Sequence, residues 1–222
     1  FTGTPRTGKT TLINNLKDFF KKGKFSVDIL EEFTTSDNYK KNIYPKLKNH
    51  YTSIVNFEIP KYVLKQLNET IECNNDIIIV DRSLFDRLIW VDRLFLKDGI
   101  DLKDYNNYKL EYIPLIKDKI NIVIATYTDS FTAICRDYNA NLSIEKRNFL
   151  NEDNVDEYNK SLLNMKELAN KEGVNFYLID TTDRNQREVS FEVIEYILDD
   201  MRKYYLTNIK ENIEKCIKKE FK

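Results

Sequence analysis

The feature that most constrains this chain is the segment Gly3-Thr4-Pro5-Arg6-Thr7-Gly8-Lys9-Thr10, which matches the pattern G-x-x-x-x-G-K-S/T at every position. In such a loop the glycines let backbone N–H groups curl around phosphate oxygens, and the dipole of the following helix adds positive potential. The lysine neutralises phosphate charge, and the hydroxyl of the last residue holds Mg²⁺. The expected ligands are therefore ATP and Mg²⁺, although the loop itself does not distinguish ATP from GTP. The residues expected to contact the nucleotide are Gly3, Thr4, Pro5, Arg6, Thr7, Gly8, Lys9, Thr10 and Thr11.

Helical and strand-like segments alternate along the chain after this loop. Amphipathic helical stretches at residues 9–22, 84–97 and 155–172 are each followed by a glycine, at positions 23, 99 and 173. Short apolar segments of strand length lie at residues 25–30, 76–80, 120–125 and 174–179. Runs of consecutive aliphatic residues suit strands that are buried on both faces. This pattern predicts an α/β fold, a three-layer sandwich with a mostly parallel central sheet and helices on both faces.

The expected organisation is one domain over residues 1–205, followed by a Lys-rich helical tail over residues 206–222. The last helix of the domain is expected to begin at Gln186 and to reach about Tyr205. Because a phosphate-binding loop follows a strand, we expect the first strand to be truncated at Phe1.

Composition argues against a nucleic-acid-binding protein, a membrane protein and a disulfide-rich protein. Lys plus Arg total 35 and Asp plus Glu total 36, so the net charge is -1 and no global field attracts nucleic acid. A local basic patch leaves nucleic acid possible but not favoured as a partner. No apolar run approaches the ~20 residues that span a bilayer, so we expect no membrane association. The three cysteines are far apart in the sequence, which favours a reducing cytoplasm over a disulfide framework.

A second site is expected where the run Ile77-Ile78-Ile79-Val80 ends at Asp81. An acid at the carboxyl end of a buried strand lies beside the phosphates in this type of fold and reaches Mg²⁺ directly or through water. Thr10 and Asp81 are therefore the expected metal ligands.

The triplet Asp81-Arg82-Ser83 resembles the Asp/Glu-Arg-Ser signature of deoxynucleoside kinases and is similar to the Asp-Arg segment of thymidylate kinases. The resemblance implies ATP- and Mg²⁺-dependent phosphoryl transfer to a nucleoside or nucleoside monophosphate. It implies that Arg82 contacts the acceptor or the transferring phosphate. It also implies a catalytic glutamate at the end of the second strand, where Glu31 and Glu32 are both candidates.

The resemblance also implies a lid at about residues 136–150, whose arginines close over the nucleotide. Arg136 and Arg147 are the candidates to offset charge on the transferring phosphoryl group, with Lys146 in reserve. The segment at residues 179–183 commonly lies against the nucleobase of the donor in this fold, and it equally suits a cap for the last helix.

Other functions remain open or are disfavoured. A GTPase, a transporter-type ATPase and an oligomeric remodelling ATPase each require motifs that are missing; for example, Arg82 follows Asp81 where a remodelling ATPase usually carries a glutamate. A polynucleotide 5′-hydroxyl kinase would share the motifs, and the Lys-rich tail is its support. An ATP-binding sensor with little transfer activity is the third possibility. The acceptor and the oligomeric state are not specified by the sequence.

Overall fold

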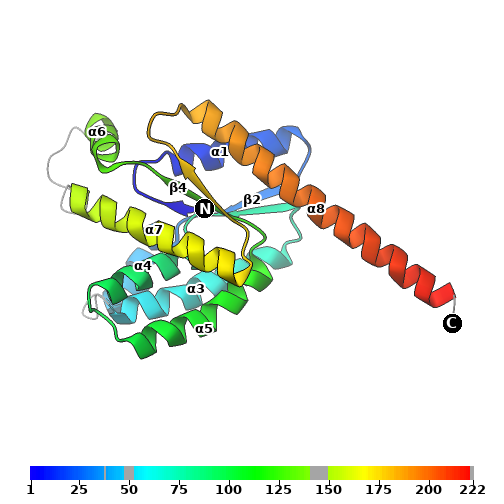
Figure 1. Cartoon of the computed structure of the whole chain (residues 1–222), viewed down its shortest axis with the longest axis horizontal. Helices are drawn as coiled ribbons and strands as arrows, with labels where there is room; N and C mark the ends of the chain where they lie inside the picture. The colour runs from blue at the N-terminus through cyan, green and yellow to red at the C-terminus, as the bar shows by residue number, and fades with distance from the viewer. Residues whose placement is uncertain (38, 48–52, 141–149, 221–222) are drawn as a thin grey trace.

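The computed structural model describes the chain except for residues 38, 48–52, 141–149 and 221–222 (Figure 1). The strands are β1 (Thr2–Gly3), β2 (Val27–Leu30), β3 (Ile77–Val80), β4 (Val123–Tyr127) and β5 (Phe176–Asp180). The helices are α1 (Lys9–Lys22), α2 (Tyr44–Leu47), α3 (Ser53–Glu72), α4 (Leu84–Leu96), α5 (Leu102–Lys119), α6 (Ser130–Ala140), α7 (Glu152–Glu172) and α8 (Gln186–Glu220). A 3₁₀-helix, η1 (Phe33–Thr35), and a π-helix, η2 (Tyr39–Ile43), lie between β2 and α2.

All strand pairings in the described part of the chain are parallel. β2 pairs with β3, and β4 pairs with β1 on one side and β5 on the other. Phe1 connects the two groups, because its amino group donates to the Val80 carbonyl at 2.6 Å and its carbonyl accepts from the Arg82 N–H at 2.8 Å. The strands therefore lie in the order β2-β3-β1-β4-β5. This arrangement confirms the predicted α/β fold with a parallel sheet.

Helices cover both faces of the sheet, and each face has its own core. α1 packs against α8 on one face (Figure 1), where Leu16 and Phe20 meet Ile124 and Ile179 of the strands. α3, α4, α5 and α7 cover the other face, around a larger cluster that includes Val123 and Ala125. Neighbouring residues of β4 thus point to opposite cores, as the alternation of a strand requires.

The predicted strands are present but begin later than the apolar patterns indicate, and one helix was not identified from the pattern. α5 begins at Leu102, directly after Asp101, whose side chain caps the helix by accepting from the Asp104 N–H at 2.7 Å. Two of its four buried residues are Tyr108 and Tyr112, with Ile113 and Ile116. Tyrosines carry the apolar face of this helix, so its periodicity is weak when only aliphatic residues are counted.

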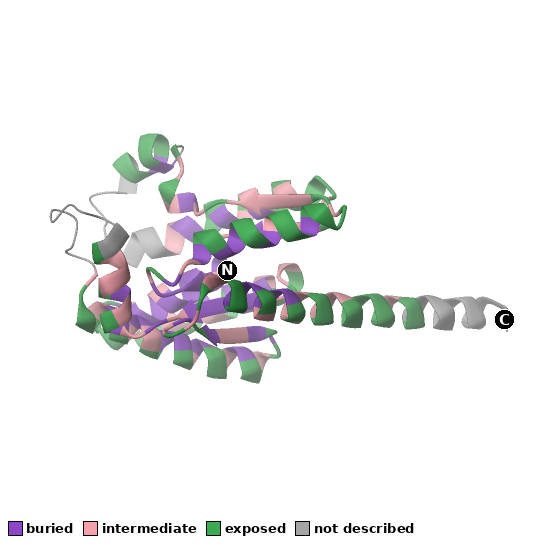
Figure 2. Cartoon of the chain, turned by 90° about the horizontal axis from the view of Figure 1, so that it is seen from above, coloured by how far each residue is buried: buried purple, intermediate pink, exposed green. Residues whose placement is uncertain are grey.

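The last helix continues without interruption from Gln186 to Glu220, and its C-terminal half extends away from the rest of the molecule (Figures 1 and 2). The burial colours of Figure 2 change from mixed to exposed along this helix. The division between a domain at residues 1–205 and a tail at 206–222 stays a prediction. Within the described ranges, no helix combines the length and apolar character that crossing a membrane requires.

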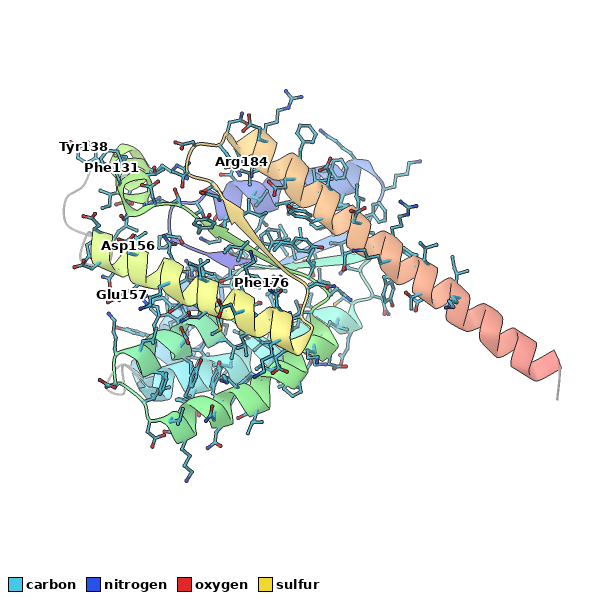
Figure 3. The ribbon with its side chains drawn as sticks, viewed as in Figure 1. Phe131, Tyr138, Asp156, Glu157, Phe176 and Arg184 are labelled. Carbon is cyan, nitrogen blue, oxygen red and sulfur yellow. The ribbon has the colours of Figure 1, made fainter. Side chains whose placement is uncertain are left out.

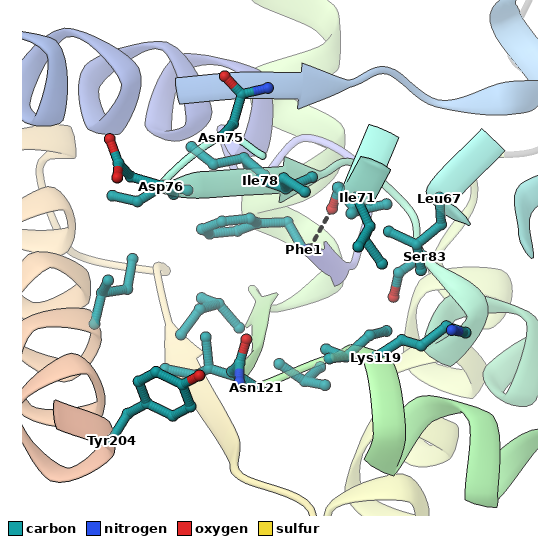
Figure 4. A pocket seen from close by; sticks show the side chains of 18 of the residues that line it. Phe1, Leu67, Ile71, Asn75, Asp76, Ile78, Ser83, Lys119, Asn121 and Tyr204 are labelled. Carbon is teal, nitrogen blue, oxygen red and sulfur yellow. Dashed lines mark hydrogen bonds between the residues drawn. The ribbon is translucent and has the colours of Figure 1, made fainter. Parts of the chain in front are cut away.

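A cavity of about 520 Å³ lies between the facing edges of β3 and β4, beyond Phe1 (Figure 4). Residues of β3 and β4 such as Ile78 and Ile124 line it, together with residues of α3, α5 and α8 such as Leu67, Lys119 and Tyr204. None of the residues from Gly3 to Thr10, which form the predicted phosphate-binding loop, contributes to its walls. Although this cavity is larger than the one at the loop, it therefore belongs to the sheet and is separate from the predicted site.

Candidate phosphate-binding site

The loop between β1 and α1 has the backbone conformation that its glycines permit. Gly3 has a φ of +137°, and a Cβ at this position would overlap the carbonyl oxygen of Thr126 in β4. Gly8 has a φ of +82° and precedes the first residue of α1, so the chain turns sharply from the loop into the helix. Hydrogen bonds from the Thr4 N–H to the Thr126 carbonyl (2.9 Å) and between the hydroxyls of Thr7 and Thr126 (2.6 Å) hold the loop on the sheet.

Lys9 lies folded against this loop. Its Nζ donates to the carbonyl oxygens of Gly3 at 3.0 Å and Thr4 at 2.6 Å, and the residue is 8% exposed. Burial, with Arg82 nearby as a second cause, lowers the pKa of Lys9 to about 7. The ammonium group therefore occupies the inside of the loop, where phosphate oxygens would replace the two carbonyls as its partners.

A cavity of about 460 Å³ opens at the loop and brings together most of the predicted site. Its walls come from three parts of the chain: the loop with the start of α1, the ends of β2 and β3, and α6. The lining residues are Pro5, Arg6, Gly8, Lys9, Thr10, Thr11, Glu32, Asp81, Arg82 and Arg136. Parallel strands end at one edge of the sheet, which is why residues distant in sequence meet here.

Asp81 follows β3 and presents an unusual carboxylate. Its N–H donates to the Leu30 carbonyl at 2.8 Å, which fixes the strand end, while its Oδ1 is buried and has no hydrogen-bond partner. Burial raises the pKa of Asp81 above its ordinary value. A buried carboxylate oxygen without a partner, in a cavity that Thr10 also lines, fits a Mg²⁺ ligand.

The described residues contain no group of three His, Cys, Asp or Glu side chains that would hold a metal ion alone. This is compatible with Mg²⁺, which keeps several waters and is usually bound by one or two carboxylates together with substrate phosphates. Thr10 and Asp81 stay the predicted ligands.

The two candidate glutamates have different positions. Glu32 lines the cavity and forms an ion pair with Arg82, with 3.0 Å between Oε2 and Nε. Its other oxygen accepts from the Thr34 hydroxyl at 2.7 Å. Glu31 is exposed and does not contribute to the cavity wall. The geometry thus separates two residues that the sequence left as equals.

Arg82 has a left-handed backbone with a φ of +56°, which is uncommon for a residue with a side chain. Besides Glu32, its guanidinium contacts Asp86, with 3.2 Å between Nη1 and Oδ1. Asp86 was not singled out from the sequence. The available signal was its position four residues after Arg82 at the start of a helix, where an arginine and an acid face each other.

Arg136 joins helix α6 to the connection between β5 and α8. Its guanidinium donates to the carbonyls of Thr181 and Thr182, and to the Thr181 hydroxyl at 3.2 Å. Arg6 and Asp137 add an ion pair between the phosphate-binding loop and the same helix. Arg147 and Lys146 lie outside the described residues, as does most of the predicted lid at 136–150.

A second cavity of about 250 Å³ adjoins the first and shares Arg6, Gly8 and Arg136 with it. Thr181, Arg184 and Gln186 of the connection between β5 and α8 complete its walls. Figure 3 shows Arg184 in that connection, across from α6. The segment near residues 179–183, for which the sequence suggested a position against a nucleobase, thus reaches the phosphate-binding loop.

Comparison with solved structures identifies similarity to deoxyadenosine kinase from M. mycoides. The structure with the products dCMP and a flexible dCDP has 19% identity, a TM-score of 0.56, and covers 89% of this chain and 96% of that chain. The structure with bound dCTP has 22% identity, the same coverage and a TM-score of 0.56. The structure with bound dATP has 23% identity, a TM-score of 0.52, and covers 89% of this chain and 97% of that chain.

No protein-family model and no curated protein sequence matches the chain. At identities below a quarter, the structural likeness establishes a P-loop kinase fold of the deoxynucleoside kinase type.

Proposed function

We propose that this protein is a kinase that transfers the γ-phosphoryl group of ATP, with Mg²⁺, to a nucleoside or nucleoside monophosphate. One observation carries the proposal: Glu32, Asp81 and Arg82 line the same cavity as Lys9 and Thr10. This set contains a lysine for the donor phosphates, two ligands for the metal, a carboxylate that can accept the proton of the acceptor hydroxyl, and an arginine for the transferring phosphoryl group. The fold shared with deoxyadenosine kinase structures supports the same class of reaction.

The residues of the loop would bind the donor. Backbone N–H groups of the loop and the N-terminus of α1 would surround the β- and γ-phosphates. Lys9 would leave the carbonyls of Gly3 and Thr4 and turn to the phosphate oxygens. Thr10 and Asp81 would hold Mg²⁺, which would offset the negative charge of the phosphates.

Glu32 would accept the proton of the attacking hydroxyl. The oxygen of the acceptor forms a bond to the γ-phosphorus, the bond from that phosphorus to the β–γ bridging oxygen breaks, and ADP leaves with the electron pair. The proton of the hydroxyl passes to a carboxylate oxygen of Glu32. We assign this role to Glu32 because it lines the cavity while Glu31 is exposed.

Two cations would offset the charge that spreads over the transferring group. Arg82 lines the cavity and contacts both Glu32 and Asp86. Arg136 lines both cavities and would contact the nucleotide from the lid side. Arg147 stays a proposed phosphate contact on the basis of the resemblance alone.

The proposal is tested by incubating the protein with MgATP and a panel of acceptors. The panel contains nucleosides, nucleoside monophosphates and 5′-hydroxyl oligonucleotides, with mass spectrometry of the products and Lys9→Ala as the control. A phosphorylated nucleoside or nucleotide that is absent in the variant supports the proposal. Phosphorylation of the oligonucleotides alone, or ATP binding without any product, contradicts it.

A further inference from the structure

We propose that Asp86 is a positioning residue that fixes the guanidinium of Arg82 in the cavity wall. Glu32 can then give up its contact with Arg82 and bind the hydroxyl of the acceptor, while Arg82 stays in place. The inference rests on the proposed kinase function and adds to it a residue that does not contact the cavity. It is carried by the hydrogen-bond geometry around one buried carboxylate.

Asp86 is fully buried, and both of its oxygens are occupied. Oδ1 accepts from the Thr2 hydroxyl at 2.6 Å, from the Tyr158 hydroxyl at 2.8 Å and from Arg82 at 3.2 Å. Oδ2 accepts from the Trp90 indole at 3.1 Å and lies 3.4 Å from Nη2 of Arg87. These donors come from β1, α4 and α7, so the carboxylate is held from several directions.

Such a carboxylate stays ionised over the working range of an enzyme. Burial by itself would raise the pKa of Asp86, but Arg82 and Arg87, with the hydroxyl donors, bring it to about 2. A buried charge is costly to leave without partners, and the donors around Asp86 keep it ionised and in place beside Arg82.

The contact between Arg82 and Glu32 differs from this one in the solvent exposure of its acid. The side chain of Glu32 is 26% exposed, that of Arg82 is 15% exposed and that of Asp86 is 0% exposed. Glu32 follows a strand end and lines the cavity, whereas Asp86 lies within helix α4. An acceptor hydroxyl entering the cavity can therefore replace Arg82 as a partner of Glu32 while Asp86 keeps Arg82 in place.

The left-handed backbone of Arg82 makes this anchoring necessary. A non-glycine residue with a φ of +56° persists only where surrounding contacts over-determine it. The Arg82 N–H bond to the Phe1 carbonyl holds the backbone, and Asp86 holds the far end of the side chain. Loss of either end displaces the guanidinium from the position that the reaction requires.

The test uses Asp86→Asn in the full chain, with Asp92→Asn as the matched control. Asp92 is also a buried aspartate of α4, but it accepts from the Tyr105 hydroxyl at 2.9 Å instead of contacting Arg82. Misplacement of a catalytic group by about 1 Å costs on the order of 10²-fold in rate. We therefore expect Asp86→Asn to lower kcat about 100-fold with the KM for ATP unchanged, and Asp92→Asn to keep kcat.

Combination with Arg82→Lys separates positioning from a general loss of structure. If Asp86 acts through Arg82, Asp86→Asn has no further effect on kcat in the Arg82→Lys background. Losses that multiply in the double variant would overturn the inference, and so would wild-type kcat in Asp86→Asn. A wild-type protein that phosphorylates no acceptor would overturn the proposed function itself, a result distinct from both.

A second variant keeps the inference testable if Asp86→Asn does not fold. Tyr158→Phe removes one donor to the oxygen that contacts Arg82 and changes no charge. We expect a loss of kcat of several-fold that disappears in the Arg82→Lys background. An equal loss of kcat in the wild-type and Arg82→Lys backgrounds would mean that Tyr158 and Asp86 only stabilise the fold, and it would overturn the inference.

Discussion

The position of Lys9 predicts that nucleotide binding takes up a proton. In the free protein, burial next to Arg82 lowers the pKa of Lys9 to about 7, although its Nζ donates to two carbonyls. Phosphate oxygens next to Nζ would favour the charged form and return the pKa toward its ordinary value of about 10.4. Because nucleotide binding raises the pKa of Lys9, the affinity for nucleotide is highest well below pH 7 and falls as the pH rises through 7.

The magnitude follows from the two pKa values. With a free pKa of about 7, the affinity decreases as 1 + 10^(pH − 7), which is a factor of about 2 at pH 7 and about 33 at pH 8.5. The expected loss over this interval is therefore about 16-fold, or about 1.6 kcal/mol. Proton uptake should rise from about 0.5 per nucleotide at pH 7 to nearly 1 at pH 8.5.

Isothermal titration calorimetry of MgATP measures both quantities. Titrations in two buffers of different ionisation enthalpy give the number of protons taken up, and titrations between pH 7 and 8.5 give the dissociation constant. Lys9→Ala serves as the control, because it retains the other titrating groups and should bind weakly with little dependence on pH. An affinity that is constant over this range, with no proton uptake, would refute the lowered pKa of Lys9 in the free protein.

Two other predictions concern the loop and the glutamates. Gly3→Ala should lower the free energy of unfolding by more than about 2 kcal/mol, because its Cβ would overlap the Thr126 carbonyl at a φ of +137°. Gly173→Ala is the control: its φ is +70° and no atom lies within 4 Å of the added Cβ, so it should lower the free energy of unfolding by only about 1 kcal/mol. Equal shifts of the urea midpoint in the two variants would show that the contact between a Cβ at position 3 and the Thr126 carbonyl is unimportant. Glu32→Gln should lower kcat about 10²–10⁴-fold while Glu31→Gln keeps it, as steady-state assays with the identified acceptor would measure. The reverse order would move the base to Glu31.

The sequence predicted those parts of the site that depend on local spacing. The loop from Gly3 to Thr10 and the strand that ends at Asp81 are contiguous patterns, and each lies in the structure where the pattern indicates. The parallel sheet followed from aliphatic runs such as residues 77–80, whose composition predicts burial on both faces. In the structure only Ile79 of this strand is buried, and the other three residues are half-buried.

The parts that the sequence did not predict depend on side-chain direction or on distant contacts. Glu31 and Glu32 are neighbours, and only the turn into η1 decides which of them enters the cavity. Asp86 acquires its role from donors as far away in the sequence as Thr2 and Tyr158. Such contacts between distant segments leave no periodic signal in one sequence.

The central claim is that the cavity at the loop couples cleavage of ATP to an acceptor. The measurement that tests it most directly is the rate of ADP formation with and without the acceptor panel, together with the amount of phosphorylated product. We predict that ADP forms at an appreciable rate only when an acceptor is present, with one phosphorylated product for each ADP. Rapid ADP formation without acceptor, or ADP in excess of product, would contradict the account.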